Sequence, residues 1–298
     1  MSAAQTEQSH ASARGFDLLP LEEAMTILAR GQAEAAQAVE AAVPALAEAA
    51  RLAAESIASG GRLIYAAAGS SALMALADAL ELPGTYGIAP EQIKVLFAGG
   101  VEMLTQLRGG PEDDEAAAQA EIEAAAVAPK DCVIALTASG STPYPIAAAD
   151  AARAAGAKTV GISNNRDAAL FNHVDVAVCL LTPPEVIAGS TRMGAGTAQK
   201  IALNMLSTMV ATQLGHVHDG YMVNVVADNL KLQDRAKRIV MAIAAVREDE
   251  AAQALEATQG NAKLGILLAS GASDLNAARA LLERNGGKLR GALHALKS

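Results

Sequence analysis

A turn rich in hydroxyl side chains follows one of the most apolar runs of the sequence. Residues 132–136 read Cys-Val-Ile-Ala-Leu, and Thr137, Ser139, Gly140 and Thr142 come directly after them. An apolar run of this length is typical of a buried strand. A strand-to-helix turn that presents several O–H and N–H donors without bulky side chains is suited to a dianionic phosphate. A Ser/Thr-rich helix cap is the alternative for this turn taken alone.

Two other segments carry similar chemistry. Ser71 follows the apolar run 62–67. Ser190 and Thr191 directly precede a predicted helix over 192–214. Unpaired backbone N–H groups and the positive end of the helix dipole favour an anion at such a helix start. Three segments of this kind in one chain favour a phosphosugar site over an isolated helix cap.

The elements that must position these side chains alternate along the chain. Helical patterns lie between the apolar runs, which indicates a parallel sheet with helices on both faces, joined by right-handed crossovers. Ligands of such sheets bind beyond the carboxyl ends of the strands, where the hydroxyl turns stand. The sequence predicts strands over 62–67, 93–98, 132–136, 159–163 and 174–181, and helices over 114–126, 145–155, 192–214 and 222–240, after two helices within 20–59.

The composition suggests three segments of different character. Residues 1–15 are small and polar and predict a disordered tail. Residues 16–241 hold the alternating pattern of an α/β domain. In residues 242–298 the helical pattern is acidic and interrupted by glycines, which predicts a small domain of three short helices. Such a domain is too small to bury much apolar surface by itself.

Charge and composition exclude several classes of protein. A net charge of −9 without a basic cluster argues against nucleic acid and anionic membranes as partners. No apolar segment reaches membrane-spanning length, and the N-terminus lacks the basic and apolar parts of a signal peptide.

The two cysteines, Cys132 and Cys179, lie in apolar runs and favour a reduced, cytoplasmic protein. The histidines have no metal-site spacing, so we expect neither metal nor cofactor.

One long stretch carries a family resemblance. Residues 184–208 begin Pro-Glu-Val-Ile-Ala-Gly-Ser-Thr-Arg and continue through Gly-Thr-Ala-Gln-Lys, which resembles the signature of the N-acetylmuramic acid 6-phosphate etherases. These are sugar-isomerase-domain (SIS) proteins related to the glucokinase regulatory protein. The resemblance implies an SIS-type three-layer αβα sandwich with a five-stranded parallel sheet and a small, UBA-like helical domain. It also implies phosphate binding by Ser71, Thr137, Ser139 and Thr142, and sugar binding by Glu185, Ser190 and Thr191.

The resemblance further implies a lyase reaction. The etherases remove the proton on C2 of the open-chain sugar, expel the lactyl group from C3 and add water, in the recovery of peptidoglycan sugars. Residues 78–87 resemble the family's catalytic segment, whose glutamate matches Glu81. Taken locally, Glu81 is either a partly shielded acid/base group or a solvated carboxylate at a helix end. Related SIS domains pair so that each subunit contributes to its neighbour's pocket, so we expect a homodimer.

The chain departs from the family at two positions near the expected chemistry. A gap-free count from residues 98–100 puts the family's second glutamate at Gly109, and a family arginine is replaced by Leu73. Glu112 or Asp113 is available to substitute, or to serve as the acidic first turn of the next helix. Loss of the second carboxylate keeps two alternatives open: a phosphosugar-binding sensor without turnover, and a phosphosugar isomerase.

Overall fold

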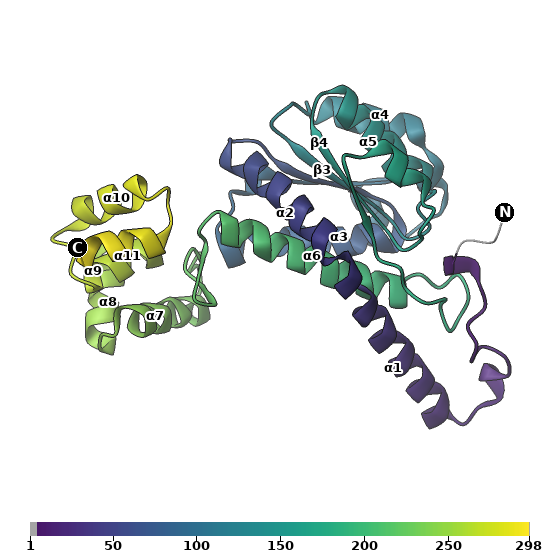
Figure 1. The fold of residues 1–298 in the computed structure, drawn as a ribbon, viewed down its shortest axis with the longest axis horizontal. Helices are drawn as coiled ribbons and strands as arrows, with labels where there is room; N and C mark the ends of the chain where they lie inside the picture. The colour runs from purple at the N-terminus through teal and green to yellow at the C-terminus, as the bar shows by residue number, and fades with distance from the viewer. Residues whose placement is uncertain (1–4, 298) are drawn as a thin grey trace. The chain divides into compact units, whose positions relative to one another are not determined.

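A computed structural model describes residues 5–297 of the chain (Figure 1). The chain divides into two compact units. Unit 1 comprises the residues up to 79 together with 91–207, and unit 2 comprises 80–90 together with the residues from 208 onward. The boundary expected at 241/242 is therefore wrong, because the packing described below joins residues 208–241 to the C-terminal helices.

Unit 1 is built on a parallel sheet of five strands, as predicted. The strand order is β2-β1-β3-β4-β5, and every neighbouring pair is parallel. The chain passes from β1 to β2 on one side of β1 and then crosses to β3 on the other side. The strand order therefore reverses between β1 and β3. The strands are β1 Leu63–Ala67, β2 Ile93–Phe97, β3 Cys132–Thr137, β4 Lys158–Ser163 and β5 Val176–Cys179.

Helices cover both faces of this sheet and make the three layers of an αβα sandwich (Figure 1). The face formed by Ile64, Ala66 and Val133 packs against two helices, α4 and α5. Neighbouring side chains on a strand point to opposite faces, so Tyr65 faces the other helical layer. The helices of the first layer are α4 Glu115–Ala124 and α5 Pro143–Ala154; those of the second are α2 Val43–Ala58, α3 Gly69–Tyr86 and α6 Gly194–Gln213.

A buried polar network joins β1 to α3 and α6. The phenol of Tyr65 donates to Asp78 Oδ2 at 2.8 Å, while Asn204 Nδ2 and Ser207 Oγ donate to Asp78 Oδ1 at 2.8 and 2.9 Å. Burial and the Asp78 carboxylate raise the pKa of Tyr65 well above its ordinary value, so its hydroxyl remains a donor. A buried carboxylate needs such partners, and here they fix the position of α3.

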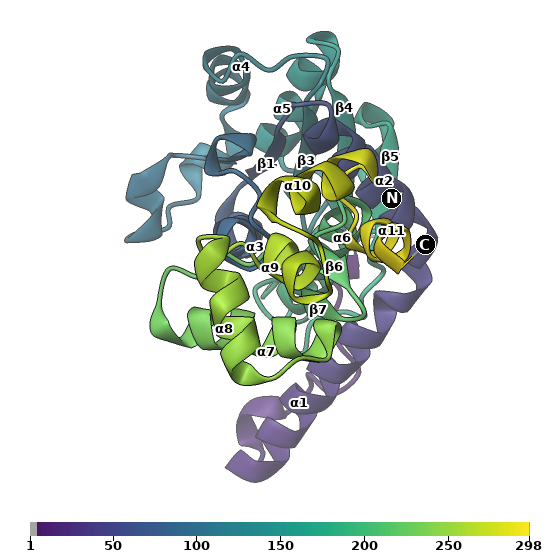
Figure 2. The ribbon, with the colours of Figure 1, turned by 90° about the vertical axis from the view of Figure 1, so that its left-hand side faces the viewer.

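Helix α1, Leu21–Ala38, packs loosely. It extends away from the sheet in both views (Figure 1, Figure 2), and Leu21 and Met25 are 75% and 60% exposed. Short 3-10 helices also occur in the described chain, and η4 begins in unit 2 and ends in unit 1. They are η1 Gln5–Glu7, η2 Phe16–Leu18, η3 Glu40–Ala42, η4 Pro90–Gln92, η5 Val101–Leu104, η6 Gly110–Asp113 and η7 Ala169–His173.

The N-terminal segment differs from the expected disordered tail. Residues 1–4 lie outside the described part of the chain, but η1 follows at once and buries Thr6. Hydrogen bonds to the distant Asn165 hold this turn in place. Composition indicates how little apolar surface a segment can bury, and it carries no information about polar anchors supplied by another part of the chain.

Unit 2 contains a short hairpin and five helices in its C-terminal part. Residues 222–229, predicted to start a helix, instead complete the hairpin and a loop. Helix α7 belongs to this unit because Ile239 and Val240 pack with Leu264 and Ile266 of α9 in one apolar core. Four helices, not three, follow α7. The elements are β6 Val217–His218, β7 Tyr221–Met222, α7 Leu230–Ala244, α8 Glu248–Ala257, α9 Ala262–Ala269, α10 Leu275–Arg284 and α11 Leu289–Lys297.

Candidate functional site

A polar pocket of about 330 Å³ opens at the carboxyl ends of β1 and β3 in unit 1. This is where the strand order reverses, the place at which open parallel sheets bind ligands. Its lining comes from the segments after β1 and β3, from η1 and η6, and from the loop before α6. The lining residues are Glu7, Ala68, Gly69, Ser70, Ser71, Glu112, Asp113, Leu136, Thr137, Ala138, Ser139, Ser141, Thr142, Pro143, Gly189 and Thr191.

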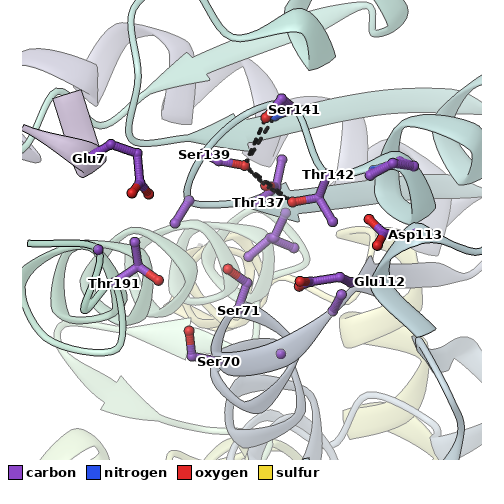
Figure 3. Close-up of a pocket in the computed structure, with 16 residues that line it drawn as sticks. Glu7, Ser70, Ser71, Glu112, Asp113, Thr137, Ser139, Ser141, Thr142 and Thr191 are labelled. Atoms are coloured by element: carbon purple, nitrogen blue, oxygen red, sulfur yellow. Dashed lines mark hydrogen bonds between the residues drawn. The ribbon is translucent and has the colours of Figure 1, made fainter. Parts of the chain in front are cut away.

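Three predicted phosphate-binding hydroxyls meet in this pocket. Thr137 Oγ1 lies 2.6 Å from Thr142 Oγ1 and 3.1 Å from Ser139 Oγ, and the last two oxygens are 3.2 Å apart (Figure 3). Thr142 precedes α5, yet its side chain does not cap that helix. The helix-cap interpretation therefore fails for Thr142, and the hydroxyls form a cluster that faces the pocket.

Gly140 allows the hydroxyl turn to adopt its shape. Its φ is +79°, a conformation that favours glycine. A Cβ added there would lie 2.2 Å from the Cβ of Ala168 and 2.7 Å from Ser163 Oγ. The turn therefore packs tightly on the end of β4, and Gly140 N–H donates to Thr137 Oγ1 at 3.2 Å.

Two helices begin at the pocket, and the positive ends of their dipoles lie there. Ser70 and Ser71 lie in the first turn of α3, and Pro143 opens α5. Ser71 is buried, and its hydroxyl is directed into the pocket (Figure 3). Of the described lining residues, none is Lys or Arg. An anion here depends on hydroxyls, backbone N–H groups and two helix dipoles.

Carboxylates stand on two sides of the hydroxyl cluster. Glu112 and Asp113 lie on one side and Glu7 on the other (Figure 3). Glu112 Oε1 lies 3.9 Å from the position that a Gly109 Cβ would occupy. The side chain of Glu112 thus extends beside the backbone position where the second glutamate of the resemblance is missing.

The segment 185–191, predicted to bind the sugar, lines the pocket only in part. Thr191 lines the pocket, whereas Ser190 and Glu185 are not among the described lining residues. Glu185 is buried, and its two oxygens accept the N–H groups of Gly194 and Ala195 at 2.9 and 2.8 Å. The start of α6 is therefore neutralised by a carboxylate of the chain itself, so the geometry favours a structural role for Glu185.

The rest of the resembling stretch positions other elements. Gln199 Nε2 donates to Asn164 Oδ1 at 3.0 Å, both residues being buried. Thr197 Oγ1 lies 2.5 Å from the side-chain amide of Gln32. Asn204 and Ser207 belong to the Asp78 network described above. Much of the stretch therefore fastens α6 to the sheet and to α1.

Glu81 is not among the described residues that line this pocket. Helix α3 continues through Pro83 to Tyr86, so Glu81 stands inside the helix and not at the helix end that the local sequence suggested. Its side chain is exposed, and it belongs to unit 2. Of the two alternatives left open for Glu81, the single chain shows the solvated carboxylate.

Several pocket residues had no role in the sequence prediction. Ser70 and Ser141 extend the hydroxyl set, and Ser141 Oγ lies 3.3 Å from Ser139 Oγ. Adjacency to the predicted turns was the available signal for both. Glu7 had no local signal, because its place depends on Asn165, nearly 160 residues later.

The described residues offer neither a metal site nor a membrane span. Within 5–297, no group of three or more His, Cys, Asp or Glu side chains could hold a metal ion. No helix of that range is both long and apolar enough to cross a membrane.

The chain is similar to SIS-domain proteins and to named etherases. A family model described as SIS domain matches residues 28–164. An N-acetylmuramic acid 6-phosphate etherase of Deinococcus radiodurans is 42% identical over 96% of this chain and 94% of its own length. An etherase of the same name from Mycolicibacterium smegmatis is 41% identical over 99% of each chain. One from Symbiobacterium thermophilum is 44% identical over 82% of this chain and 81% of its own.

A solved structure shares the fold. A phosphoheptose isomerase from Neisseria gonorrhoeae superimposes with a TM-score of 0.51 at 17% identity, over 64% of this chain and 99% of that one. This likeness concerns the αβα architecture alone.

Proposed function

Because the chain belongs to the N-acetylmuramic acid 6-phosphate etherase family, we propose that it cleaves the lactyl ether of N-acetylmuramic acid 6-phosphate. Removal of the C2 proton, loss of lactate from C3 and addition of water yield N-acetylglucosamine 6-phosphate and D-lactate. The observation that carries the proposal is the cluster of Thr137, Ser139 and Thr142 hydroxyls at the reversal of strand order.

The phosphate binds at this cluster. Thr137, Ser139, Thr142 and Ser71 donate O–H groups to its oxygens, and the starts of α3 and α5 face its charge. Hydrogen bonds to a charged group each contribute about 1.5–3 kcal/mol. Such a site holds a dianion without a basic side chain. Thr191 lies at the sugar end of the same pocket.

The acid/base group of the reaction is Glu81. Its assignment rests on the match of residues 78–87 to the family. Since Glu81 is exposed and lies outside the pocket lining of its own chain, we assign the completion of the site to a homodimer, in which each subunit contributes to its neighbour's pocket.

The homodimer predicts a molecule of twice the 30.2 kDa chain mass. The apolar side chains of Leu21, Met25 and Met205 are 75%, 60% and 36% exposed, and a second subunit would cover surface of this kind. Light scattering at micromolar concentration measures the mass. A monomer at that concentration would contradict the assembly.

Glu112 acts as the second carboxylate in place of the one missing at Gly109. The Glu112→Gln variant should lower kcat by about 10²-fold, the lower end of general acid–base effects, and change substrate affinity little. Glu115→Gln is the matched control, because Glu115 is a nearby exposed glutamate outside the pocket lining. Equal kcat values for the Glu112→Gln variant and the wild type would remove Glu112 from the mechanism.

Release of lactate from N-acetylmuramic acid 6-phosphate by the purified protein tests the function directly. Binding without lactate release would instead support a phosphosugar sensor, the alternative that the glycine at position 109 favours. The substrate is a phosphorylated sugar, which cells make and retain in the cytoplasm. We therefore assign the reaction to that compartment and to the recycling of peptidoglycan sugars.

A further inference from the structure

The turn at the start of the described chain is fastened to unit 1 by one buried amide. Asn165 is 5% exposed and follows β4. Its Oδ1 accepts the backbone N–H of Gln5 at 2.6 Å and that of Thr6 at 3.4 Å, and its Nδ2 donates to Thr6 Oγ1 at 3.2 Å. Such contacts, made by a buried side chain, specify where η1 lies.

The same amide holds the hydroxyl turn of the phosphate site. Asn165 Nδ2 also lies 3.0 Å from the carbonyl oxygens of both Ala138 and Ser139. The N–H of Gly189 also donates to the carbonyl oxygen of Thr6 at 3.1 Å. The turn thus connects the loop after β3 with the loop before α6, and both loops line the pocket.

Glu7 ends this turn, and its carboxylate is directed into the pocket (Figure 3). It faces the hydroxyl cluster from the side of Thr191. Glu7 Oε2 also lies 3.5 Å from the position of a Cβ on Gly189. A carboxylate accepts hydrogen bonds and repels anions, so Glu7 cannot be a phosphate ligand. The hydroxyl and amide N–H donors of a sugar are its suitable partners.

We propose that Glu7 is a specificity-determining residue that accepts hydrogen bonds from the sugar part of the ligand, and that Asn165 is its positioning residue. This inference rests on the proposed function for its ligand class, a phosphorylated amino sugar. It makes the N-terminal turn part of the binding site, with the phosphate on the hydroxyl cluster and the sugar between that cluster and Glu7.

Loss of the Glu7 charge should change the affinities for a sugar phosphate and for inorganic phosphate differently. Calorimetry of the Glu7→Gln variant should show about tenfold weaker binding of N-acetylglucosamine 6-phosphate, because a charge-assisted hydrogen bond is replaced by a neutral one. Inorganic phosphate, which lacks the sugar, should bind equally or more tightly because a repulsive charge is gone. Glu22→Gln is the control, an exposed glutamate of α1 outside the pocket lining.

Other patterns would overturn the inference. Tighter binding of both ligands would make Glu7 a source of repulsion only, and unchanged binding of both would place it outside the site. These outcomes are independent of turnover. If the wild type releases lactate while Glu7→Gln binds the sugar phosphate normally, the inference alone fails. If the wild type does not bind the sugar phosphate, the proposed function and the inference fail together.

The positioning role of Asn165 needs a separate measurement. In a double-mutant cycle, Asn165→Ala and Glu7→Gln should be strongly non-additive for the sugar phosphate, because either change removes the same contact. Additive losses would contradict the role. A chain that begins at Ser9, which lacks the turn but keeps Asn165, should reproduce the sugar-specific loss of Glu7→Gln. Normal sugar-phosphate affinity of that chain would also overturn the proposal.

Discussion

The Glu81→Gln variant is expected to bind N-acetylmuramic acid 6-phosphate within a few-fold of the wild type and to turn it over about 10²–10⁴ times more slowly. Gln is nearly isosteric with Glu, so contacts to the ligand survive, whereas the group that takes the C2 proton is lost. Initial rates of lactate release, with affinity measured by calorimetry, separate the two effects.

Hydrogen exchange gives an independent view of the same step. In deuterated water, the wild type should introduce deuterium at C2 of the product, because a carboxyl that holds the proton can exchange it with solvent. Glu81→Gln should lose this exchange together with turnover. Glu91→Gln is the matched control, since Glu91 is another exposed glutamate outside the pocket lining. An unchanged kcat for Glu81→Gln would remove Glu81 from the reaction.

Replacing both Ser139 and Thr142 by Ala is expected to weaken phosphosugar binding at least about a hundredfold. The change removes two hydroxyl donors to a dianion, each contributing about 1.5–3 kcal/mol. The side chain of Thr142 bonds to other hydroxyls of the cluster and does not cap α5, so the fold should persist. Calorimetry measures the affinity, and circular dichroism the folded state.

A matched pair of hydroxyl deletions provides the control. Thr26 and Thr212 are exposed helical residues whose hydroxyls bond to a carbonyl of their own helix. Replacing both by Ala removes the same number of hydroxyls and should leave affinity unchanged. Should the Ser139/Thr142 variant also bind normally, the phosphate site must lie elsewhere than the turn after β3.

The strands and the hydroxyl turn could be predicted because their signals are local. The run 132–136 is apolar without alternation, as expected for a strand buried on both faces, and β3 spans Cys132–Thr137. The turn after it contains Gly140, whose conformation and packing leave little room for another residue. Both features depend on residues within a few positions of each other.

Which residues within 184–208 line the pocket and which hold α6 in place could not be predicted. The resemblance assigned Glu185, Ser190 and Thr191 to the sugar, but Glu185 caps α6. Ser207, later in the same stretch, bonds to Asp78. A family motif records which residues recur together. It does not separate residues that bind a ligand from residues that hold the binding elements, because both are equally required.

By itself, the sequence determined the α/β class, the succession of strands and helices in unit 1 and the hydroxyl-rich turn after β3, all of which follow from short-range patterns of burial and backbone conformation. Only the tertiary structure decided that Glu7 enters the pocket, that Glu185 and Glu81 do not line it, and that α7 packs with the C-terminal helices. Each of these depends on residues far apart in the chain; Asn165 and Gln5 are 160 positions apart. Local preferences do not encode such contacts, which form only where the closed fold brings a buried polar group to its partner.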